Sequence, residues 1–266
     1  MVSYCDAGVN LFSNQFDSDR AEVIERAHLN AVRQLLLISS DVAESRLNLD
    51  YCQGRHSLVC TAGVHPHQAA AVAPDWLQTL MPLLADPAVV AVGECGLDYN
   101  RDFSPRPAQL QVFEQQLELA SRVNKAVYLH ERDAFADQIA LLKSFPALTG
   151  VAHCFTGDSV QLRAYLDRGL YIGITGWLCD ERRNQSMIEA LTYLPLDRIL
   201  LETDAPYLLP RTLADKPKSR RNEPAFVSSI AAQIAQLKQL SLDQVAEQTT
   251  LNFNRLFRPV EPSDGV

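Results

Sequence analysis

The sequence predicts an α/β fold, a closed (β/α)8 barrel of the TIM type, from three observations. Short apolar runs alternate with amphipathic stretches along the chain. The chain has 266 residues, and a barrel of this type takes roughly 250 residues. Several apolar runs end in a polar residue, as expected where parallel strands open onto one shared face.

Eight apolar runs supply the predicted strands. They are rich in Val, Ile, Leu, Ala and Cys, which is typical of parallel strands that are buried on both faces. In chain order they cover approximately residues 2–7, 32–39, 57–64, 88–93, 126–130, 149–154, 170–175 and 198–203.

Apolar residues at helical spacing predict helices between the runs. They recur at Ala21, Ile24, Ala27 and Ala31, at Leu110, Phe113, Leu117 and Ala120, and at Phe135, Ile139 and Leu142. Asp41 and Glu44 have the spacing of a capping box. Asp158 suits the start of a helix that Gly169 would end.

We expect one barrel domain over residues 1–260 and a short C-terminal tail at 261–266, because no linker, repeat or low-complexity segment divides the chain. The alternative is an open, doubly wound sheet, which would be expected to carry a Gly-rich turn after an early strand. The stretch after the first strand reads DAGVNLFSNQF and does not match GxGxxG.

The composition predicts a cytoplasmic protein with no membrane contact. The N-terminus, MVSYCDAGVN, lacks a signal-peptide pattern, and no run approaches the roughly 20 apolar residues that span a bilayer. The six cysteines form no CxxC pair, which favours reduced thiols. We expect a monomer, because the chain has no long apolar surface stripe.

The net charge of −8 argues against non-specific duplex binding through a broad basic face. It leaves room for an enzyme that grips a strand end with a few local cations. The densest basic stretch contains Arg211, Lys216, Lys218, Arg220 and Arg221. A solvated loop is the simpler interpretation of such a run.

Polar residues cluster at the ends of the predicted strands. The first run ends near Asp6 and Asn10 and the third at His65-Pro66-His67, while later runs end at Glu94, His130, His153 and Asp204. Each residue alone has an ordinary structural explanation, such as a cap or an Asx turn. Four strands that deliver Glu, His, His and Asp to one rim would be costly unless these groups are paired or bind a metal.

We therefore predict a metal site at Glu94, His130, His153 and Asp204. Imidazole and carboxylate ligands suit zinc, manganese or iron, and also magnesium with added waters. Such a metal lowers the pKa of a bound water and polarises a carbonyl or phosphoryl oxygen.

Strand alternation extends this prediction to the neighbouring residues. If Glu94 and His153 point into the barrel, Cys95 and Cys154 point outward to the helices. Glu202 lies on the face of Asp204 one layer deeper, either as a partner of the site or as a buried structural acid.

Six segments resemble the TatD family of metal-dependent deoxyribonucleases, in the same order from about Asp6 to Phe257. They are TAGVHPH (61–67), VGECGLDYNRDFS (92–104), AHCFTG (152–157), YIGITGW (171–177), ETDAPYLLP (202–210) and SRRNEP (219–224). The resemblance implies a TIM-type barrel and Mg²⁺-stimulated 3′-5′ exonuclease action on single-stranded DNA and RNA ends, with a role in DNA repair.

The resemblance also assigns residues. It implies that Glu94, His130, His153 and Asp204 are metal ligands, and that His65 and His67 lie beside the substrate phosphate. The Arg221-Asn222-Glu223-Pro224 loop would help to form the rim, which makes Arg221 and Asn222 candidate substrate-binding residues.

The first strand departs from the family pattern. Most members carry Asp-x-His-x-His there and use both histidines to hold a metal, whereas this chain has Gly8 and Asn10. We therefore expect one firm metal position at Glu94, His130 and His153. Asp204 would be shared with a weaker neighbouring position.

The candidate catalytic residues are Glu94, Asp204 and His65. Asp204 is either a ligand or the general base that takes the proton of the attacking water. His65 contacts the phosphate or protonates the leaving oxygen. Arg132 either binds phosphate or forms a salt bridge with Asp133 or a rim carboxylate.

Three aromatic side chains follow predicted strands, namely Phe103, Trp177 and Tyr207. They could stack on bases at the rim, although core positions are the simpler interpretation. Magnesium is the metal we expect in turnover, with Zn²⁺ and Mn²⁺ as alternatives.

Two other functions stay open. A metal-dependent amidohydrolase, lactonase or aminoacyl-tRNA esterase would use the same barrel and the same activated water. A non-catalytic binding protein would explain why Gly8 and Asn10 stand in place of the histidines, but the presence of the other four candidate ligands argues against it.

Overall fold

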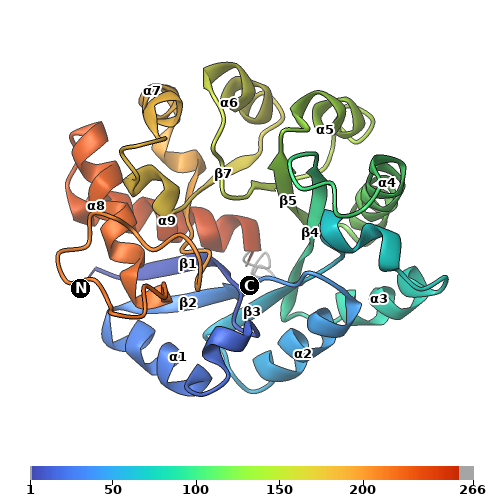
Figure 1. Cartoon of the computed structure of the whole chain (residues 1–266), viewed down its shortest axis with the longest axis horizontal. Coiled ribbons are helices and arrows are strands. Elements are labelled where there is room, and N and C mark those ends of the chain that lie inside the picture. The colour runs from blue at the N-terminus through green and yellow to red at the C-terminus, as the bar shows by residue number, and fades with distance from the viewer. Residues whose placement is uncertain (1, 258–266) are drawn as a thin grey trace, which may run out of the picture.

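The computed structural model describes residues 2–257 and contains eight parallel strands that follow one another around a barrel in chain order (Figure 1). Each predicted apolar run overlaps one strand, although β1, β4 and β5 extend beyond their runs, so the (β/α)8 prediction is confirmed. The strands are β1 Tyr4–Val9, β2 Val32–Leu37, β3 Leu58–Ala62, β4 Val89–Asp98, β5 Ala126–Arg132, β6 Gly150–Ala152, β7 Tyr171–Ile174 and β8 Ile199–Leu201.

The first and last strands meet just beyond the end of β8. Val9 and Ala205 form a parallel bridge. The Asp204 amide donates to Gly8 O at 2.9 Å, and the Asn10 amide donates to Ala205 O at 2.8 Å. These contacts exclude the open-sheet alternative and hold Asn10 close to Asp204.

The helices surround the strands (Figure 1). They are α1 Arg20–Leu29, α2 Val42–Cys52, α3 Trp76–Leu84, α4 Arg106–Val123, α5 Phe135–Leu142, α6 Ser159–Leu166, α7 Gln185–Tyr193, α8 Val227–Lys238 and α9 Leu242–Phe257. Short 3₁₀ turns lie at η1 Asn14–Phe16, η2 Pro66–Ala71, η3 Gly176–Cys179, η4 Leu196–Arg198 and η5 Pro224–Phe226.

The apolar spacing is confirmed in α4 and partly wrong in α1. Phe113 and Leu117 are buried in α4 as predicted. In α1 the buried face includes Val23, while Ala21 is exposed. Ala31 lies beyond the end of the helix with φ 63°, so it belongs to the turn before β2.

The two predicted caps differ. Asp158 starts α6 with a complete capping box, and Gly169 takes a positive φ of 71° in the turn after that helix. Asp41 accepts the Glu44 amide at 2.8 Å. The Glu44 carboxylate, however, binds the Ser40 amide instead of the N-cap amide, so the box of α2 is only half formed.

Side chains fill one end of the barrel, whereas the other end is open. Phe253 and Phe257 of α9 belong to the same buried cluster as Cys5, Ala126 and Tyr171, which lie at the beginnings of strands. The amino ends are thus packed with side chains, and the carboxyl ends are left to form a cavity.

No helix within residues 2–257 is long and apolar enough to cross a membrane. The predicted tail at 261–266 lies outside the described residues.

Candidate metal-dependent active site

A cavity of about 580 Å³ opens at the carboxyl ends of the strands, and we call it the catalytic cavity. Its lining includes every residue that the sequence placed at the rim as a metal ligand or phosphate neighbour: His65, His67, Glu94, His130, Arg132, His153 and Asp204. Residues up to 139 positions apart in the sequence therefore meet, because they lie at or just beyond the carboxyl ends of β3, β4, β5, β6 and β8.

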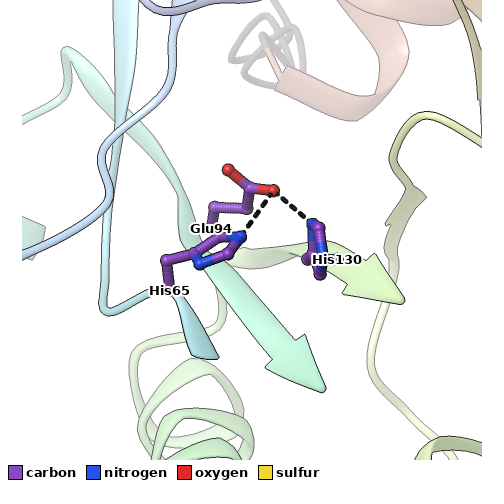
Figure 2. A group of neighbouring side chains, drawn as sticks. All are labelled: His65, Glu94 and His130. Carbon is purple, nitrogen blue, oxygen red and sulfur yellow. Dashed lines mark hydrogen bonds and ion pairs between the residues drawn. The ribbon is translucent and has the colours of Figure 1, made fainter. Parts of the chain in front are cut away.

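The Glu94 carboxylate lies at the centre of the cluster. Its Oε1 atom is 2.8 Å from His130 Nδ1 and 3.5 Å from His65 Nε2. Figure 2 shows both rings turned toward this oxygen. The same oxygen lies 3.8 Å from His153 Nε2. Three imidazoles therefore surround one carboxylate oxygen.

Asp204 lies on the other side of His153. Its Oδ1 atom is 3.8 Å from His153 Nε2 and accepts a hydrogen bond of 2.9 Å from Asn10 Nδ2. The four predicted metal ligands thus form a continuous series from His130 through Glu94 and His153 to Asp204.

The charges of the cluster follow from burial and from the neighbouring groups. Burial raises the pKa of Glu94, but His65, His130 and His153 together hold it below its ordinary value. Burial lowers the pKa of His65 to about 3 and keeps that ring neutral. Burial raises the pKa of Asp204 to about 6, against the opposing effect of His153.

Glu202 fixes the orientation of His153. Its Oε2 atom lies 2.8 Å from His153 Nδ1 and accepts the Cys154 amide at 2.9 Å, and its Oε1 atom accepts Tyr128 Oη at 3.1 Å. Burial lowers the pKa of His153, but the Glu202 charge raises it to about 10. With Nδ1 donating to Glu202, Nε2 faces Glu94 and Asp204, so the partner role predicted as one option for Glu202 is the one found.

The first strand and the residue after it contribute Gly8, which has no side chain, and Asn10, whose side chain holds Asp204. A methyl group at Gly8 would lie 2.5 Å from Tyr128 Oη and 3.2 Å from Ile38 Cδ1. Tyr128 therefore fills the space into which a larger side chain at position 8 would extend. Asn10 uses its amide nitrogen to hold Asp204.

Asp98 is a residue of the cluster that the sequence analysis missed. Its Oδ2 atom lies 2.7 Å from His67 Nε2 and 3.4 Å from His130 Nε2. Burial raises the pKa of Asp98, but the nearby His130 ring and hydrogen bonds with the Arg101 amide and His67 hold it below its ordinary value. The signal was available, because β4 continues to Asp98 and alternation puts positions 94 and 98 on one face.

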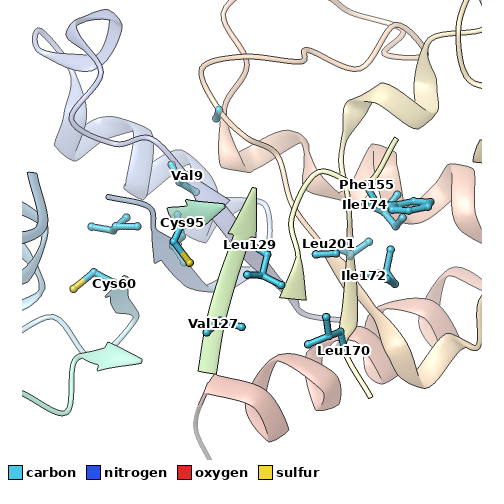
Figure 3. Close-up of a cluster of buried hydrophobic side chains, with 14 of the residues drawn as sticks. Val9, Cys60, Cys95, Val127, Leu129, Phe155, Leu170, Ile172, Ile174 and Leu201 are labelled. Carbon is cyan, nitrogen blue, oxygen red and sulfur yellow. The ribbon is translucent and has the colours of Figure 1, made fainter. Parts of the chain in front are cut away.

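The two cysteines next to the predicted ligands point in different directions. Cys95 packs in the helix-facing cluster with Val9 and Leu129, as predicted (Figure 3). The outward orientation predicted for Cys154 is wrong. Its φ of 47° breaks strand alternation, and its side chain lines the catalytic cavity beside His153 and Asp204.

Arg132 reaches the catalytic cavity with its guanidinium available. Its Nη1 donates to Thr156 Oγ1 at 3.1 Å, and its Cζ lies 4.8 Å from the centre of the Trp177 ring. Within residues 2–257 it forms no ion pair, so the salt bridge considered as an alternative is not formed.

Two of the three rim aromatics are exposed, and the third packs against the core. Phe103 is 68% exposed and stacks edgewise on His67, and Tyr207 is 51% exposed and lines the catalytic cavity. Trp177 is half-buried. The core interpretation is therefore wrong for Phe103 and Tyr207, because both lie in loops beyond the strand ends.

Arg221 and Asn222 do not line the catalytic cavity. Arg221 binds Asp19 at 2.7 Å and Glu223 at 2.8 Å. Asn222 is buried and donates to Thr203 O and Tyr207 O. Both side chains tie the loop after β8 to its surroundings.

The cluster fits a divalent metal. Ligand atoms of His65, Glu94 and His130 lie within 4.8 Å of one another, as do those of His153, Cys154 and Asp204. Among the described residues the buried His130 Nε2 has no hydrogen-bond partner. Imidazole held by a carboxylate, as in His153–Glu202, is the usual support of a metal-binding histidine.

Comparison with known proteins decides the family. A family model described as TatD related DNase matches residues 5–258. The chain belongs to the TatD-related DNase family. A relative from Erwinia amylovora named 3′-5′ ssDNA/RNA exonuclease TatD is 46% identical over 95% of this chain and 98% of its own length. One of the same name from Edwardsiella piscicida is 47% identical over 95% and 98%.

Solved structures of the TatD family share the fold. A TatD family hydrolase from Entamoeba histolytica is 25% identical with a TM-score of 0.88, covering 98% of this chain and 100% of that one. A TatD homologue from Escherichia coli K12 is 25% identical with a TM-score of 0.87, covering 96% and 97%. An organophosphate hydrolase engineered from a lactonase template, 15% identical with a TM-score of 0.61, shares the fold alone.

Proposed function

We propose that this TatD family chain is a metal-dependent 3′-5′ exonuclease that hydrolyses phosphodiester bonds at the ends of single-stranded DNA and RNA. The observation that carries the proposal is the convergence of Glu94, His130, His153 and Asp204 in one cavity that the Arg132 side chain also lines. The names of the relatives from Erwinia amylovora and Edwardsiella piscicida support this substrate class.

In this proposal Glu94, His130, His153 and Asp204 hold the divalent metal, with Mg²⁺ in turnover and Zn²⁺ or Mn²⁺ as alternatives. When bound, such a metal lowers the pKa of a water and stabilises negative charge on a phosphoryl oxygen. The His153–Glu202 pair presents the ligand atom Nε2 toward the cluster.

Asp204 is the candidate proton acceptor. Its carboxylate lines the catalytic cavity 3.8 Å from His153 Nε2, where it can accept the proton of an attacking water. Asn10 engages Oδ1, so the second oxygen is the one left for a water.

His65 suits phosphate contact better than proton donation to the leaving group. Its Nδ1 accepts the His67 amide at 3.1 Å, which leaves the ring proton on Nε2, facing Glu94. With a pKa of about 3 the ring carries no second proton near neutral pH. It can therefore donate one hydrogen bond to a phosphate oxygen.

Arg132 and the rim aromatics complete the binding site in this proposal. A planar guanidinium can bind two phosphate oxygens at once. Phe103 and Tyr207 offer exposed rings on which bases can stack. His67 is held by Asp98 beside Phe103. Arg221 and Asn222 shape the rim through the contacts described above instead of reaching the substrate.

The decisive experiment incubates the protein with 3′-labelled single-stranded DNA, in parallel reactions with Mg²⁺ and with EDTA. We expect release of labelled mononucleotide in the Mg²⁺ reaction alone. A lactone, an amide and an aminoacyl-tRNA serve as competing substrates. Hydrolysis of one of these without nucleotide release would overturn the nuclease proposal in favour of the esterase or amidohydrolase alternative.

The finer expectations belong to the same proposal: a cytoplasmic monomer with a role in DNA repair. Analytical ultracentrifugation tests the monomer. Sensitivity of a deletion strain to DNA damage, restored by the intact chain and not by a His153→Ala variant, tests the repair role.

A further inference from the structure

A second cavity of about 290 Å³ lies beside the catalytic cavity, between the loops that follow β7 and β8. We call it the rim cavity; its lining includes Gly176, Asp180, Arg183, Leu208, Lys216 and Arg220. Leu208 lines both cavities. A side chain at Gly176 would overlap Leu208 O, so the two loops pack backbone against backbone.

The rim cavity is strongly basic although the chain has a net charge of −8. Five cations line it: Arg182, Arg183, Arg211, Lys216 and Arg220. The nearby carboxylates are Asp180 and Glu181. Asp180 is buried and forms ion pairs with three of the arginines, with Arg182 at 2.6 Å, Arg183 at 3.0 Å and Arg211 at 3.6 Å.

The other two cations of the rim cavity, Lys216 and Arg220, are not paired with Asp180. Lys216 and Arg220 are exposed, and within the described part of the chain neither forms an ion pair. A structural role as ion-pair partners of Asp180 explains why the three arginines lie in the rim cavity, but it does not explain Lys216 and Arg220. An anion in the cavity would account for all five.

Trp177 connects the rim cavity to the catalytic cavity. The guanidinium of Arg183, which lines the rim cavity, lies 3.6 Å from the centre of the Trp177 ring. The guanidinium of Arg132, which lines the catalytic cavity, lies 4.8 Å from the same ring. Cations alternating with an aromatic ring are the usual lining of a single-strand path.

We propose that the rim cavity binds backbone phosphates of the same strand whose end enters the catalytic cavity. This inference rests on the proposed exonuclease function and adds a second anion site to it. The rim cavity would hold the strand between successive cleavages, so long substrates would bind more tightly than a dinucleotide.

The test compares a Lys216→Ala/Arg220→Ala variant with the wild-type protein on a long single-stranded oligonucleotide and on a dinucleotide. The matched control is Arg122→Ala/Lys143→Ala. It removes two exposed cations at the C-terminal ends of α4 and α5, outside both cavities. Circular dichroism and thermal unfolding check that all variants fold.

We expect the rim variant to raise KM for the oligonucleotide about tenfold, with kcat and dinucleotide hydrolysis unchanged. Binding of a fluorescent oligonucleotide without Mg²⁺ should also weaken. The slope of log Kd against log salt should fall by about 1.4, since each phosphate contact to a single strand contributes roughly 0.7.

Equal loss on both substrates, or the same change in the control variant, would overturn the rim site. An unchanged salt slope would also overturn it. If the wild-type protein cleaves neither substrate, the exonuclease proposal fails, and the binding measurement still decides whether the rim cavity holds a strand.

Discussion

Gly8 and Tyr128 share one space in the barrel interior. The Tyr128 hydroxyl lies where a side chain at position 8 would begin, and it contacts both His153 Nδ1 at 2.7 Å and Glu202 at 3.1 Å. A side chain at position 8, where the family pattern places a histidine, would therefore displace a tyrosine that contacts His153 and Glu202.

This pairing predicts that Gly8→Ala lowers the free energy of unfolding by about 1–3 kcal/mol, the usual cost of overpacking. In a Tyr128→Phe background the hydroxyl is gone, so the same substitution should cost about 1 kcal/mol less. Urea unfolding of the four proteins of this double-mutant cycle measures the coupling. Additive costs would show that the two residues do not compete for space.

Glu202 offers a second test at the residue scale. In Glu202→Gln an amide oxygen can still accept from the Cys154 amide and from His153 Nδ1, but the negative charge that raises the pKa of His153 is lost. We expect metal affinity to fall by roughly 10- to 100-fold. Calorimetric titration with Mn²⁺ measures it.

The exposed Glu181→Gln is the matched control for that experiment, because it removes a carboxylate outside the catalytic cavity. Equal affinity in the Glu202 and Glu181 variants would mean that the Glu202 charge does not support His153 as a metal ligand.

At the scale of elements, the sequence predicted the strands and most of the site for the same reason. Buried parallel strands are continuous apolar runs, and the residue that ends each run faces the rim. The apolar pattern does not predict Asp98, because Gly93 and Gly96 interrupt it. The predicted run therefore stops at residue 93, whereas β4 continues to Asp98. The direction of the Cys154 side chain was predicted wrongly, because a pattern of apolar residues does not show which residue takes a positive φ.

The sequence also does not predict ion pairs between residues that lie far apart along the chain. Arg221 belongs to a basic stretch that suggested solvent or substrate, yet its partner Asp19 lies near the start of α1. Arg26 of α1 joins the same network through Asp19 and Glu223. Only the folded barrel brings α1 against the loop after β8.

This network predicts a pH-dependent effect of Arg221→Ala. Arg221, and then Arg26, lower the pKa of Asp19 to about 2. A carboxylate with a lowered folded-state pKa stabilises the fold above its unfolded-state value of about 4, and that stability is lost as the pH falls toward about 2. Arg221→Ala should therefore cost about 1 kcal/mol near neutral pH and less in acid.

Urea unfolding at about pH 6 and about pH 3 measures this difference. Lys218→Ala, an exposed cation of the same loop, is the control and should cost little at either pH. A cost of Arg221→Ala that grows as the pH falls would contradict the assignment.

At the scale of the whole molecule, the barrel separates stability from chemistry. Phe253 and Phe257 of α9 fill the amino ends of the strands, whereas the carboxyl ends hold the buried polar cluster around Glu94. A polar cluster of this kind is costly to bury without a ligand. Its position is explained by the metal and the phosphate that we propose it binds.

The measurement that tests this account most directly is Mg²⁺-dependent nucleotide release by His153→Ala. The control is His28→Ala, which removes a half-buried histidine of α1 outside both cavities. We predict that His153→Ala keeps its fold and loses at least about 100-fold in turnover, which is about 3 kcal/mol of activation free energy, while His28→Ala keeps wild-type turnover. Equal turnover in the two folded variants would contradict the assignment of the site.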